Sequence, residues 1–89
     1  MKKVTSKKKI IVPVFKEKNP NLVKLGLRIR NLRFEKGFTS YEHFAYEHGF
    51  HRAQFGRYES GKDDIKFSTL LKIAKAFNLS VSELLGSHF

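Results

Sequence analysis

The chain has 89 residues, no cysteine and a formal net charge of +10, from 18 lysines and arginines against 8 acidic residues. This length favours one small domain, and without cysteine the chain has neither a disulfide framework nor a thiolate site. The positive charge points to an anionic partner, with nucleic acid as the first candidate and an anionic membrane surface as the second.

Residues 1–18 are expected to form a basic arm in front of a domain that spans residues 19–89. The arm holds seven lysines and one glutamate, a composition typical of flexible chain. Its apolar run, Ile10–Phe15, is too short to span a membrane and contains Pro13, which would confine a strand to a sheet edge. We therefore expect a flexible or partly extended arm, no membrane as partner and, without cysteine, a cytoplasmic location. Two roles for the arm stay open, DNA contact and simple solubility.

The first helix is predicted to begin with Asn19 as its cap and Pro20 in its first position. Gly37 is expected to close it. Its apolar residues recur with a helical period and are expected to face inward. They are Leu22, Leu25, Ile29, Leu32 and the neighbouring Phe34.

The second and third helices are predicted on either side of Gly49, and Gly61 is expected to end the third. Thr39 and Glu42 form a T-x-x-E capping box for the second helix, with Ser40 as an alternative cap. In the second helix the residues expected to share a face are Tyr41, Phe44, Ala45 and His48. In the third helix, helical spacing places Phe55, Tyr58 and Glu59 on one face and Arg52, Ala53, Gly56 and Arg57 on the other.

The fourth helix is predicted from Phe67 to Phe77, with Asn78 as its left-handed terminator. Its expected inward residues are Leu70, Leu71, Ile73, Ala74 and Phe77. Ser80 and Glu83 form a capping box that opens a short fifth helix with Val81, Leu84 and Leu85. Five helices without a convincing core strand predict an all-α fold.

Ala45, Gly49 and Phe55 have a spacing that suits a helix-turn-helix. Alanine lets two helices cross closely, glycine takes the left-handed turn conformation, and the apolar residue fills the angle between the helices. The chain over about residues 22–85 resembles the Cro/phage-repressor-like helix-turn-helix family, the XRE-like or lambda-repressor-like DNA-binding domains. The resemblance is carried by "LRFEKG", by "YESGK" at Tyr58–Lys62 and by "LLKIAKAFNLSVSELL". It implies a compact five-helix fold, a third helix in the major groove and a homodimer on a two-fold-symmetric operator.

The resemblance also assigns roles to residues of this chain. The positions matching base contacts are Arg52, Ala53, Gln54 and Arg57. The positions matching phosphate contacts are Thr39, Ser40, Tyr41, His51, Gly61 and Lys62. Arg33 and Glu59 match a structural salt bridge. The chemistry agrees, because arginine forks onto guanine, glutamine pairs with adenine and helix N-termini present N–H groups to phosphate.

Gly56 lies in the middle of the third helix, where glycine costs roughly 1 kcal/mol relative to alanine. We expect Gly56 and Ala53 to keep the outer face slim, so that the helix approaches the floor of the groove; a tolerated surface glycine is the alternative. Three further positions depart from the family pattern. These are His48 in place of a usual leucine, the large Phe55, and Lys66 where a capping serine is usual.

The sequence therefore predicts a sequence-specific regulator that binds double-stranded DNA as a dimer and represses transcription by occupying a palindromic operator. The alternative is a protein-interaction module, such as an antitoxin or polymerase-associated factor, with weak non-specific DNA binding. No nucleophile–base pair, carboxylate dyad or phosphate-cradling loop indicates an enzyme, and no cofactor is expected. The histidines lack metal-site spacing, so no metal is expected either. A phage-type repressor, a restriction-modification controller and an antitoxin stay open, as do the fifth helix and Ile10–Phe15 as dimer surfaces.

Overall fold

The computed structural model describes residues 19–86 and 89. Five α-helices follow one another: α1 (Pro20–Glu35), α2 (Tyr41–His48), α3 (Arg52–Glu59), α4 (Phe67–Ala76) and α5 (Val81–Leu85). Over the described residues no strand occurs, and the predicted five-helix, all-α fold is confirmed. The expectations for residues 1–18 lie outside the described part of the chain.

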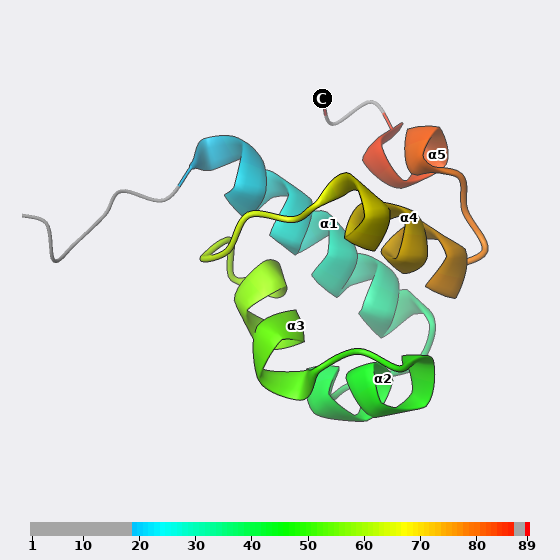
Figure 1. Ribbon diagram of the computed structural model, residues 1–89. Helices are drawn as coiled ribbons and strands as arrows, with labels where there is room; N and C mark the ends of the chain where they lie inside the picture. Colours follow the sequence, from blue (N-terminus) through cyan, green and yellow to red (C-terminus); the bar gives the residue numbers. More distant parts are fainter. Residues whose placement is uncertain (1–18, 87–88) are drawn as a thin grey trace, which may run out of the picture.

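Helix α1 is the central element of the fold (Figure 1). It contacts α2, α3 and α5, while α4 packs against α5. In Figure 1 the α2–α3 pair lies on one side of α1 and the α4–α5 pair on the other. The arrangement leaves one face of α3 against α1 and turns the opposite face outward.

The core takes one large, fully buried side chain from every helix. These residues are Ile29 of α1, Phe44 of α2, Phe55 of α3, Ile73 of α4 and Leu84 of α5. The Phe44 ring lies 5.3 Å from the Phe55 ring and stacks on Phe77 with centroids 4.9 Å apart. The large Phe55 is therefore accommodated by an aromatic cluster that joins α2, α3 and the end of α4, where aromatic contacts add to simple burial.

Most predicted helix ends occur where the local chemistry places them. Asn19 caps α1 by accepting a hydrogen bond from the backbone N–H of Asn21, 2.8 Å away. Gly49 ends α2 at φ 75°, and Asn78 follows α4 at φ 59°. Ser80 and Glu83 form both bonds of the capping box at α5, 3.0 and 2.9 Å long. These four ends follow the sequence prediction.

The predicted Thr39–Glu42 capping box is wrong, and the alternative cap is the one observed. Ser40 adopts an extended conformation, and its Oγ accepts a hydrogen bond from the backbone N–H of His43, 3.2 Å away. Helix α2 consequently begins at Tyr41, and Thr39 lies exposed in the preceding loop.

Two apolar residues expected to face inward are exposed instead. The exposed fractions are 45% for Phe34 and 48% for Leu71. In α1 the buried stripe continues from Ile29 to Arg33, four residues on, so Phe34 falls beside it. Leu71 likewise lies at the edge of the α4 stripe that buries Ile73 and Ala74.

Candidate nucleic-acid interface

The turn between α2 and α3 is stabilised by its glycine conformation, by a backbone hydrogen bond and by a lysine from α4. Gly49 adopts the left-handed conformation, and Ala45 beneath it is fully buried. The backbone N–H of Phe50 donates to the Ala45 carbonyl, 2.8 Å away. From α4, Lys72 donates to the Gly49 carbonyl at 2.7 Å, and its ammonium lies 4.6 Å from the centre of the Phe50 ring. The crossing of α2 and α3 is thus fixed, with a contribution from Lys72 that sequence reasoning missed.

Helix α3 has a buried face and an exposed face. Phe55, Tyr58 and Glu59 are buried against the core, as expected. The candidate base-contacting residues all lie exposed: Arg52, Ala53, Gln54 and Arg57. His51 stands at the N-cap position without a side-chain capping bond, so it leaves the first N–H groups of α3 available to a ligand. All four candidate base-reading side chains are therefore open to solvent, with Arg52 and Ala53 beside α2 and Gln54 on the side of α4.

Gly56 serves the packing of α2 on α3 and not the slimness of the outer face. A Cβ atom at this position would lie 2.7 Å from Cε1 and 2.9 Å from Cζ of the Tyr41 ring. The glycine thus makes room for the first side chain of α2, which lies over the middle of α3. The expectation that Gly56 gives access to the groove floor is corrected accordingly, since the surface beside it is occupied by Tyr41.

The candidate phosphate-contacting residues flank α3 in two groups. Thr39, Ser40 and Tyr41 lie at the start of α2, where the Ser40 hydroxyl already accepts the capping bond. Gly61 and Lys62 follow α3, and they differ in environment. Lys62 is exposed, whereas Gly61 is buried at φ +74°, with its Cα so close to Val23 that a Cβ would lie 2.8 Å from the Val23 Cα. Gly61 therefore packs α3 against α1.

An open hollow of about 510 Å³ lies between α2 and the start of α3. Its lining combines aromatic rings with basic groups, including Tyr41, Tyr46, His51 and Arg52, and also holds one acid, Glu42. Tyr46 is 77% exposed, although an aromatic ring on a helix usually gains by burial. The aromatic rings and Arg52 suit a sugar–phosphate backbone, which offers both apolar sugar surface and anionic oxygens, whereas Glu42 does not.

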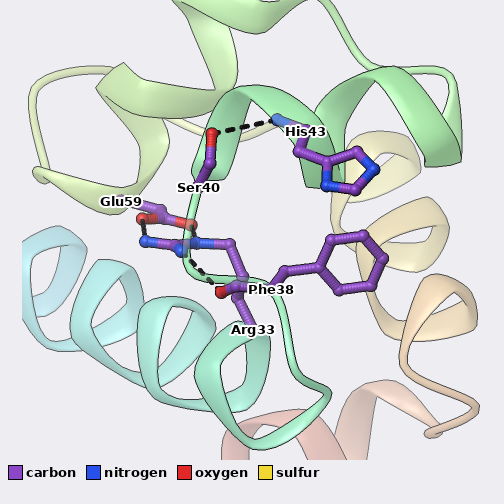
Figure 2. Close-up of polar contacts among 5 residues, drawn as sticks. All are labelled: Arg33, Phe38, Ser40, His43 and Glu59. Atoms are coloured by element: carbon purple, nitrogen blue, oxygen red, sulfur yellow. Dashed lines mark hydrogen bonds and ion pairs between the residues drawn. The ribbon is translucent and has the colours of Figure 1, made fainter.

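Arg33 and Glu59 form a buried, two-pronged ion pair between α1 and α3 (Figure 2). Arg33 Nε lies 2.7 Å from Glu59 Oε2, and Nη2 lies 2.9 Å from Oε1. The remaining nitrogen, Nη1, donates to the Phe38 carbonyl at 2.9 Å. One guanidinium thus fixes both the orientation of α3 and the loop between α1 and α2.

A second ion pair involves Arg57, one of the candidate base-contacting residues. Arg57 Nε donates to Asp63 Oδ2 at 2.7 Å, and the hydrogen bond from Arg57 lowers the pKa of the Asp63 carboxyl. Sequence reasoning missed Asp63. The available signal was its position six residues after Arg57, just beyond the turn at Gly61.

Among the described residues, no group of histidine, cysteine or acidic side chains is arranged to hold a metal ion. None of the described helices has the length and apolar content needed to cross a membrane.

A short helix, a glycine turn and a second helix with one face buried and one open define a helix-turn-helix DNA-binding domain. The chain belongs to the family of Cro/C1-type helix-turn-helix DNA-binding domains, whose family model matches residues 28–87. This family comprises DNA-binding domains of transcription regulators and is not an enzyme class. Comparison with curated proteins gives no match.

Several solved structures share the fold. The restriction-modification controller protein C.AhdI from Aeromonas hydrophila is 36% identical, with a TM-score of 0.67 over 74% of this chain and 98% of that chain. The hypothetical transcription factor NHTF from Neisseria is 26% identical, with a TM-score of 0.66 over 88% and 90%. The controller protein C.Esp1396I is also 26% identical, with a TM-score of 0.63 over 75% and 88%. These similarities agree with a DNA-binding transcription regulator.

Proposed function

We propose that this protein is a sequence-specific repressor that binds a palindromic operator as a homodimer, with α3 of each copy in the major groove. The observation that carries the proposal is that Arg52, Ala53, Gln54 and Arg57 of α3 are all exposed, while Phe55, Tyr58 and Glu59 hold the helix to the core. The mechanism is binding alone, because occupancy of a promoter is sufficient to block transcription.

The residue types at these four exposed positions suit base reading. Arg52 and Gln54 lie in the first turn of α3, and Arg57 lies one turn further on. Arginine forks onto O6 and N7 of guanine and glutamine onto N6 and N7 of adenine; each such contact discriminates by about 1–3 kcal/mol. Ala53 offers a small apolar surface that suits a thymine methyl group.

Positioning on the duplex is assigned to residues on both sides of α3. Thr39, Ser40 and Tyr41 would approach one phosphate strand from the start of α2, with His51 and Lys62 at either end of α3. Because the Ser40 hydroxyl caps α2 and Gly61 is buried, we assign these two residues a backbone contact and not a side-chain contact. Such phosphate contacts fix register but carry no sequence information.

Dimerisation follows from the operator symmetry that this class of domain reads, with half-sites about one helical turn apart. Among the roles open to such a repressor, the similarity to C.AhdI and C.Esp1396I favours a restriction-modification controller. An interaction module with non-specific DNA affinity is the rival function. It predicts equal binding to all duplexes, with a salt dependence set only by the number of phosphates contacted.

The test is selection of binding sites from a random duplex library, run in parallel with the parent chain and the Arg52→Ala/Arg57→Ala variant. The proposal predicts a palindromic consensus that the variant fails to select. The control is Lys36→Ala/Lys75→Ala, which removes the same charge from exposed positions outside α2 and α3. Loss of the consensus in both variants, or no consensus with the parent, would contradict base reading by α3. Sedimentation of the selected complex then measures how many copies bind.

A further inference from the structure

The ion pair between Arg57 and Asp63 lies at the edge of the exposed face of α3. Arg57 Nε and Asp63 Oδ2 are 2.7 Å apart, and the side chains are 57% and 26% exposed. An exposed pair of this kind contributes little to folding stability, because solvent screens the charges and two side chains must be ordered. The effect of the Arg57–Asp63 pair is local, because it restricts the rotamers of the long Arg57 side chain on the proposed recognition surface.

The backbone just before Asp63 is anchored by the turn that follows α3. The loop begins at Gly61, which is buried against Val23 in α1. The backbone N–H of Lys62 then donates to the Arg57 carbonyl at 2.9 Å. Because this bond ties the residue next to Asp63 to Arg57, the backbone of Asp63 starts from an anchored position and its carboxylate reaches Arg57.

Asp63 accepts its hydrogen bond from Arg57 Nε, a nitrogen that is not required for a two-pronged contact with guanine. The hydrogen bond uses Nε, whereas a guanidinium can fork onto guanine O6 and N7 through its two terminal nitrogens. The N–H groups of Nη1 and Nη2 therefore stay available while the side chain is held. Ordering a contact side chain before the ligand arrives reduces the entropy lost on binding.

We propose that Asp63 is a specificity-determining positioning residue, which orients Arg57 for a guanine edge and disfavours its use as a simple phosphate contact. The inference rests on the proposed reading of bases by α3 and adds a residue to it. The carboxylate acts in two ways. It fixes the guanidinium in the orientation that suits a base, and its negative charge repels the phosphate that a freely rotating Arg57 would reach.

When Asp63 is neutralised, we expect discrimination at the guanine to fall and affinity for unrelated DNA to rise. Asp63→Asn frees Arg57, so discrimination at its guanine falls by about tenfold, within the range of a lost bidentate contact. Affinity for unrelated duplex rises, and the log–log salt slope steepens by about 0.9 if Arg57 takes up one more phosphate. A merely structural role would change neither the discrimination nor the slope.

The experiment measures three affinities of the full chain by fluorescence anisotropy across a salt series. The duplexes are the selected operator, the operator with the Arg57-dependent guanine replaced, and an unrelated sequence. The Arg57-dependent guanine is identified as the base whose replacement weakens binding of the parent but leaves the affinity of Arg57→Ala unchanged. The matched control is Asp64→Asn, which removes the same charge from the adjacent exposed acid. Among the described residues, the Asp64 carboxylate accepts a hydrogen bond from the backbone N–H of Ile65 and none from Arg57.

The expected result is loss of discrimination at that guanine in Asp63→Asn and its retention in Asp64→Asn. Asp63→Glu supplies a second variant that keeps the charge but displaces the carboxylate, and it should also lose discrimination. In the Arg57→Ala background, Asp63→Asn should change nothing further at that base. Equal discrimination in Asp63→Asn, Asp64→Asn and the parent would overturn the inference while leaving base reading by α3 intact. A parent without sequence preference would overturn both.

Discussion

Arg33 of α1 and Glu59 of α3 form a buried ion pair with two hydrogen bonds, 2.7 and 2.9 Å long. The exposed fractions are 3% for Arg33 and 8% for Glu59. The pair lies on the buried side of α3, so it sets the angle at which the opposite face is presented. Its integrity therefore links the stability of the fold to the geometry of the proposed recognition surface.

Removing one partner of this pair should strongly destabilise the domain. Glu59→Ala leaves the Arg33 guanidinium buried without a counter-charge, which costs about 3–5 kcal/mol. At about 4–8 °C per kcal/mol for a domain of this size, the melting temperature should fall by tens of degrees. The double variant Arg33→Met/Glu59→Ala should recover part of the loss, because the orphan charge is gone. A thermal melt of Glu59→Ala that matches the parent would show that the Arg33–Glu59 pair does not stabilise the fold.

Two mid-helix glycines should respond differently to the same substitution. A Cβ on Gly26 would lie 2.6 Å from the carbonyl oxygen of Tyr58, and backbone atoms cannot move aside independently. Gly26→Ala should therefore force α1 and α3 apart and cost about 1–3 kcal/mol, despite the better helix propensity of alanine. Gly56→Ala meets only the outer end of the Tyr41 ring, which can rotate, so its stability should change by less than about 1 kcal/mol. Urea denaturation of the two variants measures the difference, and equal costs would contradict it.

His48 should make the fold weaker in mild acid. Its ring lies 4.3 Å from Phe44 and 5.9 Å from Phe38, and burial, helped by Lys36, lowers its pKa from 6.5. Below about pH 6.5 the unfolded chain therefore takes up a proton that the folded chain resists. The stabilising effect is fully present above pH 6.5 and is lost as the pH falls toward the lowered pKa of the folded state.

The measurement is the free energy of unfolding between pH 7.5 and about pH 5, for the parent and for His48→Leu. The stability of His48→Leu should fall less than that of the parent as the pH is lowered. His51→Ala, a substitution at an exposed histidine, should show the same fall as the parent. A decline that is unchanged in His48→Leu would assign the pH dependence to other groups.

Lys62 should affect all duplexes alike. It is exposed just beyond α3, where a phosphate contact is proposed. Lys62→Ala should weaken binding to operator and unrelated DNA by the same factor and make the log–log salt slope shallower by about 0.9. A loss confined to the operator would instead assign Lys62 to base reading.

Helical periodicity and end signals were sufficient to predict the five helices and the inner face of α3. They failed where a contact joins residues distant along the chain. Glycine at position 56 makes room for the Tyr41 ring that lies over it, and helical periodicity carries no information on that contact. Arg28 is a similar case, since it ties α1 to α5 by donating to the carbonyls of Leu84 and Glu83 at 2.8 and 3.1 Å.

Local competition between neighbouring residues limited the site prediction in another way. Thr39 and Ser40 both suit a helix cap, and only the backbone conformation decides that Ser40 takes the role. Asp63 was missed because an acid beside a proposed DNA-binding helix reads as a solvated loop residue until its distance to Arg57 is known.

Reading of base edges in the major groove by the exposed face of α3 can be measured by methylation interference on the selected duplex. Methyl groups are placed at guanine N7 in the major groove or at adenine N3 in the minor groove. We expect interference at guanine N7 in two clusters about one helical turn apart, with Arg52→Ala and Arg57→Ala each abolishing it at its own guanine. Binding that is insensitive to N7 methylation, or that responds only to adenine N3, would show that α3 does not read the major groove.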